Sequence, residues 1–456
     1  MDEDFFNNEL IEKFEQMLDN REYTYYDSED LCEIIEFYIE VNDSEYAKRA
    51  LDFAEKMHPD NLEIKIKRIE YLLSIGELKR GGKLLQEIKE IAAQELDYLL
   101  VQARYWGMKN MPRKAIRFYE DALKVDDEET DFICNCIGNE YLNLEEIRSA
   151  LEAFKRALKF NPENDYSFYS IIQCYEDIHD DMDCIEFLKE YIEDNPYSEV
   201  SWLQLGLLYL HQKKYDDAIN AFEYVIAINP NSISGHTNKA SALEGLGQFS
   251  DAINTYEETL SFDDSPAVTH LKIGENFERL EKPQKALKSY HIAIKEDPQL
   301  DKVWAKAAAL YDKLGNFEEA EYYINRAIEL DNKNVEYYSS ATYYYLKQLK
   351  FEEAIRNLAI IVEMKPLVFN SWYAYAETLI AIGEYEQAIP IIIAALRHFN
   401  RAEFFYQLSN VYYLTDQNKL GDEALTNALL LNKSLKESML DNYPILQEKI
   451  AQLNLK

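Results

Sequence analysis

The side chains most often used for catalysis or metal binding are scattered along this 456-residue sequence rather than grouped in motifs. There is no phosphate-binding GxxxxGKS/T, no dinucleotide-binding GxGxxG and no zinc-binding HExxH pattern. Cys134-x-Cys136 has the wrong spacing for a zinc knuckle, and a helix would direct these thiols about 200° apart. We expect His236 and His270 to be packing residues. The sequence therefore predicts no enzyme, no metal site and no cofactor.

Without a catalytic or metal-binding motif, the charged side chains are left to bind a partner, and the overall charge limits which classes of partner they can bind. The net charge is −36; residues 1–60 hold 19 acidic against 5 basic residues, and residues 121–200 hold 22 against 6. Such a field repels phosphate backbones and anionic lipid heads, so we expect no nucleic-acid partner and no membrane insertion. The acidity either serves solubility or attracts a basic partner.

A repeat of 34 residues, with two one-residue slips, carries these side chains. In every unit position 20 is small and position 24, one helical turn later on the same face, is large and apolar. A small residue lets two helices approach closely, and a large one fills the space between them. The units begin at residues 28, 62, 96, 131, 165, 199, 233, 267, 301, 335, 369 and 402.

Breaks in the pattern predict two helices in each unit. Position 32 is proline in six units, which ends the second helix, and position 15 is glycine in four, where the first helix stops. The unit at 62 fits least well, and its first helix is either in register or shifted by one residue. Flanking amphipathic segments predict a capping helix within 1–27, with Phe6 on its apolar side, and another within 434–456. The repeat array spans 28–433 as one continuous domain.

Two units resemble the tetratricopeptide repeat (TPR) signature. In the unit at 199 the matching residues are Trp202, Leu205, Gly206, Tyr209, Ala218, Phe222 and Pro230; Asp131 to Asn164 is a second close match. The resemblance spans about residues 28–434. It implies an all-α, right-handed α-solenoid superhelix of about twelve helix-turn-helix TPR units.

The resemblance also implies that the protein binds proteins or peptides on its concave surface, lined by first-helix positions 2, 5, 6, 9, 12 and 13. Those positions are acidic in the first two units, apolar in the unit at 199, basic in the next units and tyrosine-rich towards the end. The predicted groove residues are Leu203, Leu207, Leu210, Asn238, Lys272, Lys302, Lys306, Tyr343, Tyr373 and Tyr406.

The basic positions match only part of a known family site. Some TPR domains clamp the C-terminal carboxylate of chaperones, and Lys302 and Lys306 match the last basic pair of that clamp. Thr237, Ser241 and Lys272 stand where its other residues should be, so the full clamp is absent. The lysines either bind an acidic peptide or are solvated charges that balance local acid. Likewise, the three groove leucines, Leu203, Leu207 and Leu210, either contact a ligand or are covered by an adjacent helix.

We therefore expect a non-enzymatic scaffold or adaptor with a protein or peptide ligand in its groove. The alternatives are a self-associating structural subunit, which would form a homo-oligomer, and a regulatory subunit of an enzyme or of a secretion or assembly complex. The acidic start lacks the pattern of a secretory signal, and the five cysteines fit a reducing compartment. These features favour the cytoplasm, and the Ile-, Asn-, Lys- and Tyr-rich usage favours a bacterial source.

Overall fold

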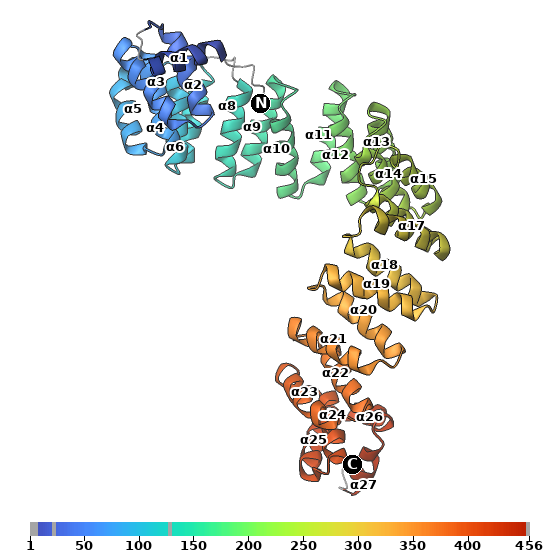
Figure 1. Cartoon of the computed structure of the whole chain (residues 1–456). Coiled ribbons are helices and arrows are strands. Elements are labelled where there is room, and N and C mark those ends of the chain that lie inside the picture. The colour runs from blue at the N-terminus through green and yellow to red at the C-terminus, as the bar shows by residue number, and fades with distance from the viewer. Residues whose placement is uncertain (1–7, 21–23, 126–129, 453–456) are drawn as a thin grey trace. The chain divides into compact units, whose positions relative to one another are not determined.

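Helices form the regular structure of the computed structural model, which describes residues 8–20, 24–125 and 130–452 (Figure 1). Within these ranges there are 27 α-helices, one three-residue 3-10 turn and no β-strand, so the predicted all-α class is confirmed. The chain divides into two compact units, Met1–Glu190 and Tyr191–Lys456. No Pro-, Gly- or Ser-rich linker accompanies this division, which falls inside α11.

The first unit begins with α1 (Asn8–Asn20) and continues as helical hairpins. Phe14 of α1 is fully buried against the first hairpin, where its ring meets Phe53 edge-on at 5.9 Å. Phe6, which the sequence places on the same face, lies outside the described residues. The helices are α2 (Ser28–Glu40), α3 (Ser44–Met57), α4 (Leu62–Ser74), α5 (Leu78–Ala92), α6 (Leu96–Met108), α7 (Pro112–Ala122), α8 (Thr130–Leu142), α9 (Ile147–Phe160), α10 (Asp165–Asp177) and α11 (Asp181–Asp194).

The second unit continues the same pattern of hairpins and ends in short helical pieces. Its helices are α12 (Glu199–His211), α13 (Tyr215–Ile228), α14 (Ile233–Gly245), α15 (Phe249–Thr259), α16 (Ala267–Arg279), α17 (Pro283–Glu296), α18 (Asp301–Lys313), α19 (Phe317–Leu330), α20 (Val335–Lys347), α21 (Phe351–Met364), α22 (Phe369–Ala381), α23 (Tyr385–His398), α24 (Ala402–Leu414), α25 (Asn418–Leu431), η1 (Lys433–Leu435), α26 (Lys436–Asn442) and α27 (Ile445–Gln452).

First helices begin where the sequence register begins a unit, except that α8 starts one residue earlier. α4 begins at Leu62, so the poorly matching unit is in register and not shifted. Every first helix is followed by a left-handed residue at position 15, with φ between 55° and 84°. This conformation closes the helix end, because the next N–H reaches a carbonyl five residues back, as from Glu77 N to Leu72 O at 2.8 Å. Four of these residues are glycines; the others are Asn42, Asn110, Glu145, His179, Lys213, Glu281, Leu349 and Asp416.

Leu349 is the position in these left-handed turns where a substitution should most easily increase the stability of the protein. Its φ is 57° and its side chain is 71% exposed, so Leu349→Gly removes backbone strain and little packing. We expect the free energy of unfolding to rise by about 0.5–1 kcal/mol, after allowance for the greater freedom of glycine in the unfolded chain. Gly383→Ala is the matched control: φ is 84° and nothing lies within 4 Å of the added Cβ, so stability should fall by about 1 kcal/mol. Urea unfolding followed by circular dichroism measures both changes, and shifts of the same sign would contradict this account.

Where the first helix has glycine at position 8, an aromatic ring of the second helix fills the space beside it. A Cβ added to Gly206 would lie 2.4 Å from the ring of Phe222, and one added to Gly138 would lie 2.5 Å from Phe154. Both rings are fully buried, as is Ala218 one turn earlier on α13. In these hairpins the large residue at position 24 therefore meets glycine at position 8 of the first helix, and the small residue at position 20 lies one turn before it on the second helix.

In several units the residue at position 4 is linked to the end of the preceding unit through a proline carbonyl. The indole N–H groups of Trp304 and Trp372 donate to Pro298 O at 3.0 Å and Pro366 O at 2.8 Å. His236, at the equivalent position, places Nε2 3.0 Å from Pro230 O and is 5% exposed. This histidine therefore takes the packing place of tryptophan.

The end of the second unit differs from the single capping helix predicted over 434–456. η1, α26 and α27 are separate pieces, and the break between α26 and α27 falls at Tyr443 and Pro444. Proline lacks an N–H and disfavours helical backbone in the residue before it, which is why the helical pattern does not continue. Leu453, the last apolar residue of the predicted helix, lies outside the described residues.

Candidate functional site

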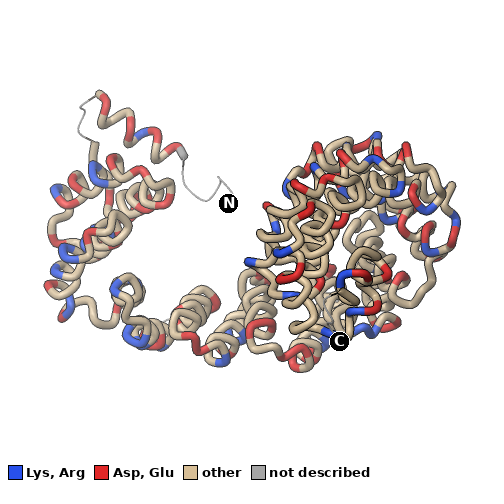
Figure 2. Tube along the Cα trace, turned by 90° about the horizontal axis from the view of Figure 1, so that it is seen from below, with Lys and Arg blue, Asp and Glu red and all other residues tan. Residues whose placement is uncertain are grey.

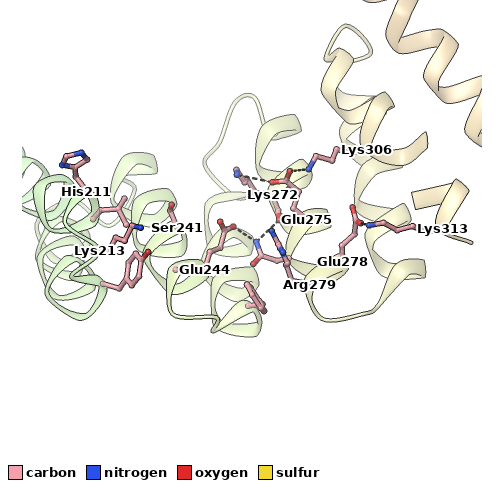
Figure 3. A pocket seen from close by; sticks show the side chains of 15 residues that line it. His211, Lys213, Ser241, Glu244, Lys272, Glu275, Glu278, Arg279, Lys306 and Lys313 are labelled. Carbon is pink, nitrogen blue, oxygen red and sulfur yellow. Dashed lines mark hydrogen bonds and ion pairs between the residues drawn. The ribbon is translucent and has the colours of Figure 1, made fainter. Parts of the chain in front are cut away.

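A pocket of about 840 Å³ lies in the second unit along α12, α14, α16 and α18, the first helices of four successive repeats (Figure 3). Most of its lining comes from positions 6, 9, 12 and 13, which the family resemblance assigns to the groove. The lining residues are Leu210, His211, Lys213, Tyr215, Ser241, Glu244, Gly245, Phe249, Lys272, Glu275, Asn276, Glu278, Arg279, Lys306 and Lys313.

The pocket is basic although the chain is acidic. Five lysine or arginine side chains and three glutamates line it, a formal excess of two positive charges against a net charge of −36. Elsewhere acidic and basic residues are interspersed along the trace (Figure 2). A local surplus of this sign favours an anionic group, because charges within a few ångströms outweigh distant ones that salt screens.

Glu275 stands between Lys272 and Lys306, two of the basic groove residues predicted from the sequence. Its carboxylate lies 3.2 Å from Lys272 Nζ and 2.7 Å from Lys306 Nζ. Burial alone would raise the pKa of Glu275, but the hydrogen bond and charge of Lys306 and the charge of Lys272 outweigh it, and the pKa lies below its usual value. The group therefore stays ionised at neutral pH. Its contribution to stability is present above the unfolded-state pKa and is lost only as the pH falls through the lower folded-state value.

The contact between Lys306 and Glu275 recurs at the same positions of other repeats, which indicates that it has a structural role. The residue at position 6 contacts the carboxylate at position 9 of the preceding repeat. Lys67 lies 3.3 Å from Glu36, and Gln407 Nε2 donates to Glu377 at 2.9 Å. Lys67 is 11% exposed and also pairs with Glu70 at 3.2 Å, so part of the predicted acidic wall in the first unit is neutralised from within. Lys306 and Glu275 therefore help to join repeats.

Two cations in the pocket have no such attachment. Arg279 and Lys213 are exposed, and neither side chain forms a hydrogen bond, an ion pair or a ring contact with any residue that the structure describes. By contrast, Lys313 lies 3.0 Å from Glu278, which also accepts a hydrogen bond from Tyr290 at 2.5 Å. The free positive charge of the pocket therefore resides mainly at Arg279 and Lys213.

Apolar side chains form part of the same wall. Leu210, Tyr215 and Phe249 line the pocket and are each partly buried. Gly245 allows the Tyr215 ring to approach α14, since a Cβ there would lie 2.3 Å from the ring. The pocket therefore combines free cations with apolar surface, which suits a peptide that carries both acidic and apolar side chains.

Of the residues predicted from the sequence, Leu210, Lys272 and Lys306 line this pocket. Lys302 is exposed and outside the lining, and Asn238 donates to Ser234 O of its own helix at 2.9 Å. Leu203 and Leu207 are partly buried against Ala218 and Phe222, so they are neither wholly covered nor freely exposed.

The three predicted tyrosines lie in different environments. Tyr343 is 50% exposed, and Lys347 Nζ lies 4.4 Å from its ring centre. Tyr373 is partly buried and stacks on Phe369 at 5.8 Å. Tyr406 is fully buried, because residues of α26 and α27 cover it, so it is not open to a ligand in this structure.

Sequence reasoning missed Arg279, Lys213, Glu275 and Glu278. Three of them occupy positions 9, 12 and 13 of the unit at 267, which were already assigned to the groove. Reading positions 9, 12 and 13 of this unit, and not only its position 6, would have found them. Lys213 could not be found in this way, because it belongs to the left-handed turn after α12.

Neither a metal site nor a membrane span emerges from the described part of the chain. No group of three or more His, Cys, Asp or Glu side chains there could hold a metal ion. Nor is any described helix long and apolar enough to cross a bilayer.

Comparison with known proteins places the repeats in a family. Models of the tetratricopeptide repeat match residues 133–164, 200–232, 301–334 and 343–410. No protein among curated sequences matches the chain. Similar solved structures include MamA (19% identity, 36% of this chain and 95% of that one, TM-score 0.33). A second is the C-terminal part of a TPR repeat-containing protein from Cytophaga hutchinsonii, with 16% identity over 52% of this chain and 98% of that one and a TM-score of 0.43. A third is the APC/C hetero-tetramer Cut9–Hcn1, with 13% identity over 92% of each chain and a TM-score of 0.35. On the matches to the repeat models, this chain contains tetratricopeptide repeats.

Proposed function

We propose that this protein is a non-enzymatic scaffold that binds an acidic, partly apolar segment of a partner protein in the pocket along α12 to α18. The observation that carries the proposal is the pair of unattached cations, Arg279 and Lys213, in a basic pocket of an acidic chain. A carboxylate of the ligand would contact these cations, and apolar ligand side chains would pack on Leu210, Tyr215 and Phe249.

Titration with matched peptides tests this function. A short labelled peptide that alternates Glu with Leu and Phe is compared with versions in which Gln or Lys replaces every Glu, using fluorescence anisotropy and the full chain. Salt should be about 0.15 M, where the screening length is about 8 Å and the distant acidic residues contribute little. We expect the Glu peptide to bind about tenfold tighter than the Gln peptide, and the Lys peptide to bind most weakly. Equal affinity for the Glu and Gln peptides would overturn the proposal.

Glu275→Gln should strengthen this binding. The substitution removes the carboxylate shared by Lys272 and Lys306 and raises the formal charge of the pocket by one. For partly exposed groups we expect a gain of about 1 kcal/mol, or about fivefold in affinity for the Glu peptide. Glu318→Gln, on an exposed residue of α19 outside the pocket, is the control with the same change in net charge. The prediction fails if both variants change the affinity equally.

A further inference from the structure

The last described segment of the chain, residues 433–452, lies on the face of α22 and α24 that corresponds to the lining of the pocket farther up the second unit. Tyr443 donates a hydrogen bond to Glu377, which occupies the same repeat position as Glu275. Lys449 Nζ lies 4.9 Å from the ring centre of Tyr413, which occupies the same position as Glu278. The segment therefore covers groove positions of the last two repeats.

Apolar anchors hold the segment there. Met439, Tyr443, Leu446 and Ile450 are 0–8% exposed and form one cluster with the fully buried Tyr406. α27 packs on α24, whereas it does not run along α25 in the way that α24 runs along α23. α27 therefore does not take the place of a further first helix, although Leu425 and Ala428 of α25 belong to the same apolar cluster as the segment.

The fit leaves polar atoms unsatisfied under the segment. Tyr406 Oη and Gln407 Oε1 are buried and have no hydrogen-bond partner among the described residues. An unpaired buried polar group is destabilising, so a ligand that supplied these bonds would fit the face better than the segment does. Glu377 already accepts from both Tyr443 and Gln407 and is the polar centre of the contact.

We infer that this face of α22 and α24 is a second binding site, separate from the basic pocket. Its ligand would be a short partner segment with a tyrosine flanked by aliphatic residues, and the chain's own segment 433–452 occupies the site until such a partner displaces it. The tyrosine hydroxyl of the partner would replace that of Tyr443 on Glu377. Because the tethered segment is present at about millimolar effective concentration, it lowers the apparent affinity of any competitor.

A peptide added in trans tests the inference. The probe is a labelled synthetic peptide of residues 433–452, titrated against the full chain by anisotropy. Tyr443→Ala/Leu446→Asp removes two anchors and should expel the tethered segment, and we expect this variant to bind the peptide at least about tenfold tighter than the wild type does. Asp441→Ala/Gln447→Ala changes two exposed residues of the same segment and should behave as the wild type. Adding Glu377→Ala to the expelled variant should abolish the gain.

Hydrogen exchange of the wild-type chain tests the same inference if the variant with the expelled segment, Tyr443→Ala/Leu446→Asp, does not fold. A displaceable segment should open by itself, so amides of α26 and α27 should exchange at least about tenfold faster than those of α24. Exchange of α26, α27 and α24 at one common rate would make the segment a structural cap and overturn the inference. A well-folded expelled variant that does not bind the peptide would also overturn it. So would a wild-type dimer that the same substitutions convert to a monomer, since the occupant would then be a second copy.

Discussion

Phe222→Ala is expected to lower the free energy of unfolding of the repeats around α13 by about 3–5 kcal/mol. The ring is fully buried and packs against Gly206, where even an added Cβ would lie 2.4 Å from it. Truncation therefore leaves a cavity that neither helix can fill, because Gly206 has no side chain and the backbones already lie close together. In a repeat array each unit is stabilised mainly by its neighbours, so the loss should be felt in α12 and α14 as well.

Native-state hydrogen exchange measures this loss helix by helix. Tyr224→Ala is the control on the same helix: its ring is 53% exposed and only stacks on Trp202 at 4.1 Å, so the loss should be about 1 kcal/mol. Amides of α12 to α14 should lose protection in Phe222→Ala far more than in Tyr224→Ala. A similar loss in both variants would show that the Gly206–Phe222 contact is not what joins the hairpin.

The helix register could be predicted from the sequence because each unit repeats the same pattern of small and large residues at its helix contacts. A small residue at position 20 and a large apolar residue at position 24 can be recognised in all twelve units, and α4 keeps the register even where its own sequence fits poorly. The left-handed turn could be predicted only where glycine marks it. At Leu349 the closed helix end and the hairpin impose a φ of 57° on a residue that does not prefer it, so residue type alone gives no warning.

The site was less predictable, because it depends on which charges find partners. Position 6 pointed to Lys272 and Lys306, which line the pocket, but the sequence cannot show that Glu275 lies between them. Tyr406 was assigned to the groove from its repeat position alone. The segment that covers it reads as one amphipathic helix, and its path back onto α24 depends on the break at Pro444 and on contacts distant in sequence.

Arg279→Glu should have the largest effect on ligand binding of any single substitution in the pocket. Arg279 is a cation of the lining without an ion pair among the described residues, so its full charge is available to a ligand carboxylate. A guanidinium can contact a carboxylate through two hydrogen bonds, and charge reversal replaces that contact with repulsion. We expect the affinity for the Glu peptide to fall by about 30- to 100-fold, which corresponds to about 2–3 kcal/mol.

Lys302→Glu is the matched control and also separates two hypotheses about the site. Lys302 is exposed, forms no ion pair within the described residues, and undergoes the same change in net charge, but it lies outside the pocket lining. If the pocket geometry decides recognition, Lys302→Glu should change the affinity less than about threefold at 0.15 M salt, because a distant charge is screened. If the basic groove positions predicted from the repeat register decide it, Lys302→Glu should weaken binding as much as Arg279→Glu. Comparison of the two variants by anisotropy with the same peptide therefore shows whether the ligand contacts Lys302 at the N-terminal end of α18 or the pocket beside α16.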